Sequence, residues 1–589
     1  METLRETTQT ILPVKKQKCG EYSYDLYPTH ELGEGKVSVG YGSLADRLIG
    51  EKLVLVDGYQ GVRFDLFVAG LKDEIEKTGK QIRLIDSSIF LKPSEEIEMM
   101  VAPFLGGDDP LFGFRTSLEL RDFFDGSKME SVRYMSDFDG ITVIYGPGAF
   151  LTGLEGLKLY VDIPKNEIQF RNRAGSITNL GTNAPEHHKK MYKRCYFVDW
   201  VVLNRHKKAF LPEIDIFVDG QREDTVTWAE GDCVRSGLDR MAENAFRVRP
   251  WFEPGAWGGT WIKEHIPDLS REAKNYAWSF ELIVPENGLI FSGGGNMLEI
   301  SFDFLMYRGG EKVVGKDCYA EYKDEFPIRM DYLDTFDGRN LSVQCHPQLP
   351  FIRSRFGEVL TQEETYYILD TKENASVYLG FKEGVDKDSF REALNDSYRN
   401  GTELDVKKYI NSETAHKHDL FLIPPGTLHS AGQNNMVLEI STTPYIFTFK
   451  MYDWLALDLD GKPRPLNIDR AMDNLCFDRQ GDVVKRELVC HPSVIERGED
   501  WILEHLSTHR NHSYDVLRYT FSSRIHRETD GKCNVINLVE GPRAEVRTAN
   551  GGNYALTYGE TLVVSADAGS YEVINEIGQE EKIVVAFMK

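Results

Sequence analysis

The sequence predicts a multidomain protein in which an α/β region with a parallel sheet precedes an all-β region. Between about residues 50 and 220, short apolar runs such as 53-LVLVDG-58 alternate with segments of helical pattern such as 64-FDLFVAGLKDEIEK-77. Strands that alternate with helices are typical of a parallel sheet. From about residue 241 onward, short apolar runs follow one another with Gly, Pro and Asn between them, which is typical of antiparallel sandwiches and barrels. The length of 589 residues also indicates more than one domain.

The α/β region is expected at residues 50–240. Residues 1–49 precede it as an extension without an assigned fold, and the polar segment 220-GQREDTVTWAEGD-232 is the predicted linker to the next domain. Further strand candidates are the following apolar runs: 82-IRLIDSS-88, 141-ITVIYGPGAF-150, 158-KLYVDIP-164 and 213-EIDIFVDG-220.

The all-β region is expected to form two domains, at residues 241–470 and 471–589. A helical pattern, 386-DKDSFREALNDSYRNG-401, interrupts the first of them. The second contains the run 515-DVLRYTFSSRIHRETDGKCNVINLVEG-541, which again shows strands separated by a Gly turn.

The overall charge argues against two classes of partner. The formal net charge is −24, whereas nucleic acids and anionic membrane surfaces are bound by cationic surfaces. A local cationic pocket for a small anion remains compatible with this charge. No apolar run of about 18 residues is present, and the N-terminus has no signal-peptide core. The eight cysteines are scattered and never form Cys-x-x-Cys, so a reducing, cytoplasmic location is expected.

Four side chains are candidates for one metal site. Gln344 and His346 lie two residues apart in 340-NLSVQCHPQLPF-351, and a strand places such residues on the same face. Glu364 follows in the strand-like segment 363-EETYYILD-370, and His429 follows the Pro-Pro-Gly-Thr turn of 420-LFLIPPGTLHSAG-432. Imidazole nitrogens with carboxylate or amide oxygens suit zinc, and also manganese or iron. The alternative is that each is an ordinary strand or loop residue, and the spacing alone does not decide between them.

Eight blocks between about residue 249 and the end of the chain resemble type I mannose-6-phosphate isomerases, which are cupin-fold metalloenzymes. The blocks occur in the family's order: 249-RPWFEPGAWGGTWIKE-264, 341-LSVQCHP-347, 355-RFGEVLTQEETYYILD-370, 376-SVYLGFKEGV-385, 423-IPPGTLHSAG-432, 438-LEIS-441, 451-MYDW-454 and 460-DGKPRPL-466. The resemblance implies a double cupin, with a metal-binding first barrel and a metal-free second one. The second barrel has 566-ADAGSYEV-573 where the first has His429.

The resemblance also implies an activity, aldose–ketose isomerisation of mannose 6-phosphate and fructose 6-phosphate or of a closely related sugar. The ligands of a Zn²⁺ or other divalent ion fall on Gln344, His346, Glu364 and His429. A base would move a proton between C1 and C2 of the open sugar, and the cation would offset charge on the enediolate oxygens. Glu439 matches a family glutamate near the substrate.

Three positions depart from the family pattern. Lys450 stands where many members carry Arg, Gln362 replaces a Lys two residues before the glutamate ligand, and Asp331 replaces a Lys of the phosphate-binding region. We therefore expect Lys450 and Glu439 as the catalytic pair. The candidates for binding a phosphate are the cations near Asp331, which are Arg329 and Arg339, besides Lys450.

The α/β region resembles P-loop kinases of the uridine kinase or phosphoribulokinase type, through 53-LVLVDGYQGVRFD-65 and 196-YFVDWVVLNRHK-207. A working phosphate loop reads Gly-x-x-x-x-Gly-Lys-Ser/Thr. Here Gly58 and Gly61 are followed by Arg63 and Phe64. We therefore expect an inactive kinase-like domain with no nucleotide-binding residues.

Three hypotheses on function follow from these observations. The first is a metal-dependent sugar isomerase whose partner is a small sugar or sugar phosphate. The alternatives are a non-catalytic cupin that senses a sugar, and a bifunctional sugar kinase–isomerase. The four ligand positions do not separate the first from the second, since a binding protein can also retain a metal.

Overall fold

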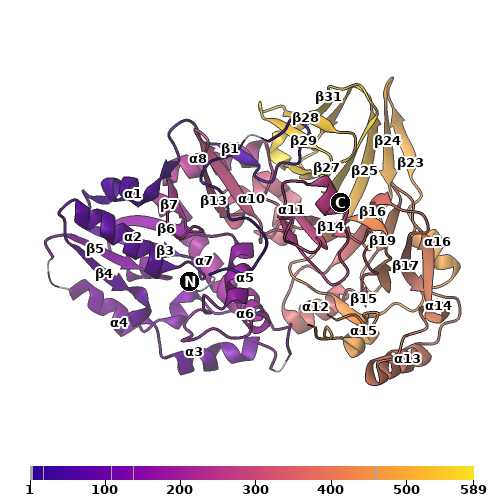
Figure 1. Ribbon diagram of the computed structural model, residues 1–589, viewed down its shortest axis with the longest axis horizontal. Helices are drawn as coiled ribbons and strands as arrows, with labels where there is room; N and C mark the ends of the chain where they lie inside the picture. Colours follow the sequence, from indigo (N-terminus) through magenta and orange to yellow (C-terminus); the bar gives the residue numbers. More distant parts are fainter. Residues whose placement is uncertain (1–3, 18, 108, 135, 137, 458–460) are drawn as a thin grey trace. The chain divides into compact units, whose positions relative to one another are not determined.

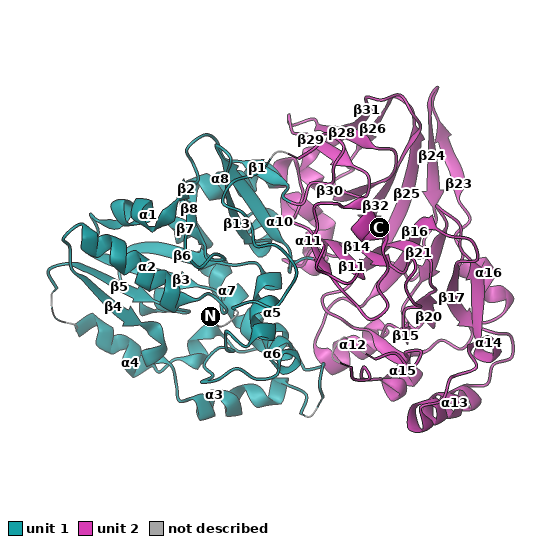
Figure 2. Ribbon diagram, in the orientation of Figure 1, with its two compact units in different colours: residues 1–18, 27–241, 284–310 teal, residues 19–26, 242–283, 311–589 magenta. Residues whose placement is uncertain are grey.

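The chain folds into two compact units (Figures 1 and 2). The structure is a computed structural model, and it describes residues 4–17, 19–107, 109–134, 136, 138–457 and 461–589. Unit 1 comprises residues 1–18, 27–241 and 284–310, and unit 2 comprises residues 19–26, 242–283 and 311–589. Asp460, in the last family-like block, lies outside the described residues. No described helix combines the length and the apolar character needed to cross a membrane.

Unit 1 is built on a seven-stranded sheet in the order β2-β8-β7-β6-β3-β5-β4. Strands β7, β6, β3, β5 and β4 are parallel to one another, and β8 runs antiparallel to both of its neighbours. The strands are β2 (Ser38–Val39), β3 (Leu53–Gly58), β4 (Ile82–Asp86), β5 (Ile141–Tyr145), β6 (Leu157–Asp162), β7 (Ile216–Asp219) and β8 (Thr227–Glu230). The central strands are buried along nearly their whole length, as expected for a parallel sheet covered on both faces.

Helices connect these strands and cover the sheet (Figure 1). Helix α2 leads from β3 toward β4, whereas α5, α6 and α7 lead from β6 to β7 in the opposite direction across the sheet. Because such crossovers are right-handed, the two sets of helices cover opposite faces. The helices are α1 (Gly40–Leu48), α2 (Phe64–Lys77), α3 (Ser94–Val101), α4 (Gly126–Ser131), α5 (Lys165–Ala174), α6 (His188–Arg194), α7 (Trp200–Phe210) and α8 (Gly231–Glu243). The parallel sheet agrees with the alternation in the sequence, while the kinase relationship stays a prediction.

The predicted linker at 220–232 is wrong. Residues 227–230 form β8, which pairs with β7 through Asp219↔Thr227 and Val218↔Trp228, and α8 begins at Gly231. The polar composition of the segment was misleading, because Thr227, Trp228 and Ala229 are buried.

A smaller sheet of unit 1 comes from two distant parts of the chain. Strands β12 (Gly288–Gly293) and β13 (Asn296–Ser301) form an antiparallel hairpin, and β1 (Thr29–Glu31) adds to β12 in parallel. Its hairpin lies in the sequence between strands of unit 2, so the units are not consecutive segments.

Unit 2 begins with two antiparallel sheets that share one buried apolar cluster. The six-stranded sheet has the order β10-β11-β14-β21-β16-β19, with β10 (Trp251–Glu253), β11 (Trp278–Leu282), β14 (Ile328–Asp334), β21 (Asn435–Thr442), β16 (Glu363–Thr371) and β19 (Leu420–Ile423). The five-stranded sheet has the order β18-β17-β20-β15-β22, with β18 (Ile410–Thr414), β17 (Ser376–Phe381), β20 (His429–Ala431), β15 (Val343–Cys345) and β22 (Phe449–Tyr452).

The expected helical insert is α13 (Lys387–Asn400). The Asp386 side chain caps its first turn by accepting from the Ser389 N–H, and Gly401 ends it with a φ of +61°. Other helices of unit 2 are α9 (Trp261–His265), α11 (Lys316–Tyr322), α12 (Leu349–Phe356), α14 (Val406–Tyr409), α15 (Ile468–Asn474) and α16 (Asp482–Glu487), and α10 (Asp303–Val314) runs from unit 1 into unit 2.

A second pair of antiparallel sheets completes unit 2 around its own apolar cluster. The seven-stranded sheet has the order β23-β24-β25-β32-β27-β30-β9, with β23 (Ser493–Arg497), β24 (Trp501–Leu506), β25 (Tyr514–Phe521), β32 (Glu581–Met588), β27 (Asn534–Glu540), β30 (Thr561–Val564) and β9 (Ala245–Phe246). The four-stranded sheet has the order β26-β31-β28-β29, with β26 (Arg524–Glu528), β31 (Ser570–Asn575), β28 (Arg543–Thr548) and β29 (Asn553–Thr557). The description of this part as a metal-free second cupin stays a prediction.

Candidate metal centre

The six-stranded sheet carries two rows of polar side chains on one face. Arg329 on β14 lies opposite Ser441 on β21, and Ser441 lies opposite Glu364 on β16. One step along, Asp331 lies opposite Glu439. Opposed residues of antiparallel strands share a face, and so do residues two apart on one strand. All five side chains therefore leave the sheet on the same side, and all five are buried.

The five-stranded sheet carries the matching row. Gln344 on β15 lies opposite His429 on β20 and opposite Lys450 on β22. These three side chains therefore share a face of this sheet. His346 follows Gln344 by two residues, and its contact with Glu364 places it in the same interior.

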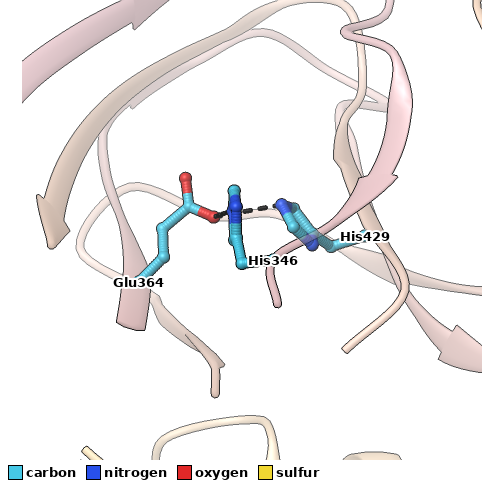
Figure 3. Close-up of side chains that lie close together, drawn as sticks. All are labelled: His346, Glu364 and His429. Atoms are coloured by element: carbon cyan, nitrogen blue, oxygen red, sulfur yellow. Dashed lines mark hydrogen bonds and ion pairs between the residues drawn. The ribbon is translucent and has the colours of Figure 1, made fainter. Parts of the chain in front are cut away.

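His346, Glu364 and His429 converge on one point (Figure 3). Glu364 Oε2 lies 2.8 Å from His346 Nε2 and 3.0 Å from His429 Nε2. One potential ligand atom from each side chain lies within 4.8 Å of the other two. Two imidazole nitrogens and one carboxylate oxygen, all buried, form a donor set that zinc and related divalent ions prefer.

Main-chain carbonyls fix the orientation of both imidazoles. His346 Nδ1 donates to Phe447 O at 3.0 Å, and His429 Nδ1 donates to Thr427 O at 2.9 Å. Because a carbonyl only accepts, the neutral rings are protonated at Nδ1 and present unprotonated Nε2 atoms to the centre. The lone pairs of two nitrogens and one carboxylate oxygen then face one another. Such an arrangement fits a cation among them.

Gln344 lies at the edge of this group. Its Nε2 is 3.3 Å from His429 Nε2, and its Oε1 accepts from Ser342 Oγ at 2.9 Å. The two ends of a side-chain amide are interchangeable by rotation, so the amide oxygen can also face the centre while the nitrogen donates to Ser342. Gln344 can therefore serve as a fourth ligand.

The buried carboxyl groups differ in their pKa values. Burial by itself raises the pKa of Glu364, but its contacts with the imidazoles of His346 and His429 lower that pKa below its ordinary value. Burial, followed by the charge of Glu364, raises the pKa of Asp331 well above its usual range, and Arg329 opposes that rise. Burial, followed by Asp331 and Glu364, likewise raises the pKa of Glu439.

The expected catalytic and phosphate-binding residues fall into two groups. Glu439 is buried opposite Asp331, in the same interior as the imidazoles, and accepts from Gln362 Nε2 at 3.3 Å. Lys450 is half-buried and lies opposite Gln344. Arg329 is 5% exposed, and its Nε has no hydrogen-bond partner among the described residues. Arg339, by contrast, is exposed in the loop before β15, where its N–H donates to Trp257 O. Its proposed contact with a phosphate stays a prediction.

The two other histidines near β19 take no part in the cluster. His416 is exposed and contacts Asp419 at 3.1 Å, while His418 contacts Tyr367 Oη at 2.9 Å and Glu540 at 3.0 Å. These are the roles expected of residues at the start of a strand.

Sequence reasoning missed the groups that orient the ligands. The carbonyls of Phe447 and Thr427 carry no side-chain signal, because any residue supplies a carbonyl. Ser342 was detectable in principle, since it precedes Gln344 by two residues and shares its face. The sequence showed that Asp331 replaces a lysine of the family, but it did not predict that Asp331 lies beside Glu439.

Known proteins resemble parts of this chain. A probable mannose-6-phosphate isomerase of Bacillus subtilis, GmuF, is 30% identical over 229 residues, which are 38% of this chain and 66% of that protein. The mannose-6-phosphate isomerase of Streptococcus mutans is 28% identical over 246 residues, 40% of this chain and 68% of that protein. The chain thus spans about two thirds of the length of these relatives, and similarity to mannose-6-phosphate isomerases holds over about 40% of it.

Residues 40–243 match a family model described as a domain of unknown function, DUF8485. Among solved structures, the mannose 6-phosphate isomerase of Bacillus subtilis matches with a TM-score of 0.47 at 18% identity, covering 58% of this chain and 99% of that one. A putative mannosephosphate isomerase of Archaeoglobus fulgidus matches with a TM-score of 0.44 at 19% identity, covering 59% and 98%.

Proposed function

We propose that this protein is a divalent-metal-dependent aldose–ketose isomerase that interconverts mannose 6-phosphate and fructose 6-phosphate, or a closely related sugar pair. The observation that carries the proposal is the pair of oriented imidazoles, each with Nδ1 on a carbonyl and Nε2 beside Glu364. The similarity to mannose-6-phosphate isomerases supports the choice of reaction.

His346, Glu364 and His429, with Gln344 as a fourth ligand, would hold the ion, for which zinc is the first candidate. When bound, the ion supplies Lewis-acid stabilisation of negative charge on the sugar oxygens. The polar rows of the two sheets meet at this point, so the ion would lie between them.

Glu439 and Lys450 are the proposed catalytic residues. Isomerisation needs a group that removes a proton from one sugar carbon and returns it to the neighbouring carbon. Glu439 lies one step from Glu364 on the paired strands, so it is a carboxyl group near the ion that need not serve as a ligand. Lys450, opposite Gln344, is a cation for the enediolate oxygens.

Arg329 is the proposed contact for the phosphate. Its guanidinium is buried on the face that carries Glu364, and its Nε lacks a partner among the described residues. A buried guanidinium N–H without an acceptor is costly, so an anionic substrate group would satisfy it. Asp331, two residues away, opposes a dianion. We therefore propose that the 6-phosphate is favoured over the free sugar only modestly.

The deciding experiment measures isomerisation and metal content together. Full-length protein is assayed with mannose, fructose and their 6-phosphates, and its metal is determined by mass spectrometry. We expect turnover with about one divalent ion per chain. The double variant His346→Ala/His429→Ala should lose both, while His416→Ala, which changes an exposed histidine, should keep both.

Two results would contradict the proposal. Metal bound at one per chain without turnover of any of the four sugars would favour a sugar-sensing role. Turnover that survives in His346→Ala/His429→Ala would place the reaction elsewhere in the chain.

A further inference from the structure

Unit 1 contains a cleft that the isomerase proposal does not use. In the seven-stranded sheet, β4 and β5 lie on one side of β3, and β6 and β7 lie on the other. The chain order therefore reverses between β3 and β6. Open α/β sheets bind ligands outside the carboxyl ends of the strands at such a reversal.

The centre of this crevice is filled by the chain itself. Asp162, at the end of β6, accepts from the Ser301 N–H at 2.6 Å. Asp303 accepts from both Lys165 and Lys207, and all three side chains are buried. Residues 301–303, which comprise the last residue of β13 and the two that follow it, thus occupy the place of a ligand. This filling weighs against kinase chemistry in the crevice.

Beside the filled centre, a narrow hollow of about 20 Å³ lies at the ends of β3, β6 and β7. Its walls are the first turn of α2, the start of α5, the loop after β7 and the N-terminal residues Leu4 and Arg5. A second hollow shares Leu4 and Arg63 with it and adds Arg173 and Ser176. The second hollow is the larger, at about 530 Å³, and because the two share lining residues we call them together the arginine cleft.

The arginine cleft is lined by more arginines than glutamates in a chain of net charge −24, and two of these arginines, Arg63 and Arg222, pair with Asp65 and Asp219. Its lining includes five arginines and three glutamates: Arg5, Arg63, Arg171, Arg173 and Arg222, and Glu6, Glu167 and Glu223. The sides of the cleft also include apolar residues, among them Leu66 and Phe67.

Two of these arginines are buried and hold the walls together. Arg171 donates to Gly61 O at 2.9 Å and to Gln221 O at 2.8 Å, so it joins the loop after β3 to the loop after β7. Arg222 donates to Asp219 and Thr227, but its buried Nε has no partner among the described residues. The walls are therefore fixed before any ligand arrives, which lowers the entropic cost of binding.

The other three arginines are partly exposed at the opening. Arg5 and Arg63 retain 22% and 25% side-chain exposure, and Arg173 is half-buried. Guanidinium groups bind phosphate oxygens through paired N–H donors, and several of them around one cavity suit a dianion. The apolar side suits an organic group. We propose that the arginine cleft binds a small organic phosphate, independently of the metal centre.

The N-terminal segment forms one wall of the cleft and should respond to binding. Arg5 contacts Glu167 at 2.9 Å, the Glu6 N–H donates to Phe170 O at 3.0 Å, and Ser176 Oγ donates to Leu4 O at 2.6 Å. A phosphate beside Arg5 would reduce its attraction to Glu167. We therefore expect hydrogen exchange of residues 4–9 to change on binding.

The test uses calorimetry on the full-length protein with ribose 5-phosphate and adenosine 5′-monophosphate as probes, and ribose, adenosine and inorganic phosphate for comparison. We expect one site per chain for a phosphorylated probe and much weaker binding of its unphosphorylated form. The same measurement in His429→Ala protein separates this site from the metal centre, and binding should persist there.

The variants Arg63→Gln and Arg173→Gln, singly and together, should weaken binding about tenfold or more. The matched control Arg121→Ala/Arg133→Ala changes two exposed arginines of unit 1 outside the cleft and should bind normally. Circular dichroism and Tm establish that each variant is folded. The proposal would be overturned if neither ribose 5-phosphate nor adenosine 5′-monophosphate bound. It would also be overturned if the folded Arg63→Gln/Arg173→Gln protein bound them with unchanged affinity.

Discussion

Gln344 and His429 lie directly opposite each other on β15 and β20, with Gln344 Nε2 3.3 Å from His429 Nε2. This pairing holds an amide against an imidazole at the edge of the carboxylate and histidine cluster. Ser342 holds the far end of the amide at 2.9 Å. The ligand set therefore depends on the register of two short strands, each of three residues.

Metal content should depend on the two histidines separately. His346→Ala or His429→Ala removes one of three converging ligand atoms, so affinity should fall by more than the roughly 10–100-fold typical of changes to outer residues. Competition with a chromogenic chelator measures this affinity. His416→Ala is the control. If His416→Ala lost the metal while both other variants kept it, the ligand assignment would be wrong.

Ser342→Ala should weaken metal binding although Ser342 is not a ligand. Without its hydroxyl, the Gln344 amide loses the contact that orients it, and we expect metal affinity to fall about 10-fold or more. The control is Ser354→Ala, an exposed serine on α12. Chelator competition measures the metal affinity of both variants. If Ser342→Ala bound the metal as tightly as Ser354→Ala, the orientation of Gln344 by Ser342 would not contribute to metal binding.

Arg329→Met should act on phosphorylated sugars selectively. Loss of a charged hydrogen bond costs roughly 1.5–3 kcal/mol, so kcat/KM for mannose 6-phosphate should fall about 10–100-fold. The value for mannose should fall much less. Arg353→Met, at an exposed position of α12, is the control. An equal fall for both sugars would mean that Arg329 supports the fold rather than the phosphate.

Asp303→Ala should destabilise unit 1 strongly. The substitution leaves the ammonium groups of Lys165 and Lys207 buried without their shared carboxylate, and breaking such a pair costs roughly 3–5 kcal/mol. Asp232→Ala is the control, because Asp232 contacts Arg235 at the surface and is 94% exposed. Its effect should stay below about 1 kcal/mol. Urea unfolding monitored by tryptophan fluorescence, with transitions of the two units fitted separately, gives both numbers.

Stability should decrease between about pH 5 and 7. Burial raises the pKa of Glu281 from 4.5 to about 7, although hydrogen bonds from Ser279 and Tyr24 oppose the rise. The folded state then binds a proton that the unfolded state has released, so Glu281 stabilises the fold at low pH. That contribution is lost as the pH rises toward 7, and it amounts to roughly 3 kcal/mol.

Glu281→Gln tests this directly, because its amide oxygen still accepts from Ser279 and Tyr24. Between pH 5 and 7 the unfolding free energy should fall less steeply with pH in Glu281→Gln than in the wild type. The difference in slope should correspond to about one fewer proton released on unfolding. The slope of the variant should not become flat, since burial also raises the pKa of Asp334 to about 7. An unchanged slope in Glu281→Gln would show that Glu281 does not titrate in this range.

The sequence predicted well those features that depend on local periodicity. The two-residue period of a strand placed Gln344 and His346 on one face, and the helical pattern of residues 386–401 predicted α13. Glu364 and His429 were candidates from their own motifs, but only the resemblance to a family favoured one shared site, because nothing in their spacing requires contact with His346. Their convergence depends on strand order, which pairs β16 with β21 and β15 with β20.

Features that depend on distant pairing were not predictable in this way. The segment around Arg222 and Glu223 is polar and was predicted to be a linker. Its residues 227–229 are nevertheless buried, because they pair with β7 as an added strand. Similarly, no residue near Lys165 or Lys207 in the sequence indicates that both form ion pairs with Asp303. Charged residues are buried only with partners, and these partners lie about a hundred residues away or more.

The β12–β13 hairpin has a consequence for how this protein is made. Leu12, Ile290 and Met297 share one small apolar cluster, and Asp303 completes the pairing of Lys165 and Lys207. During translation, the part of the chain up to residue 241 therefore emerges from the ribosome without the strands and the carboxylate that complete the fold of unit 1. Synthesis at typical rates delivers these residues seconds later. The nascent α/β domain must wait in an unfinished state, where chaperones and proteases can act on it, and a gene truncated after residue 241 should yield a poorly folded product.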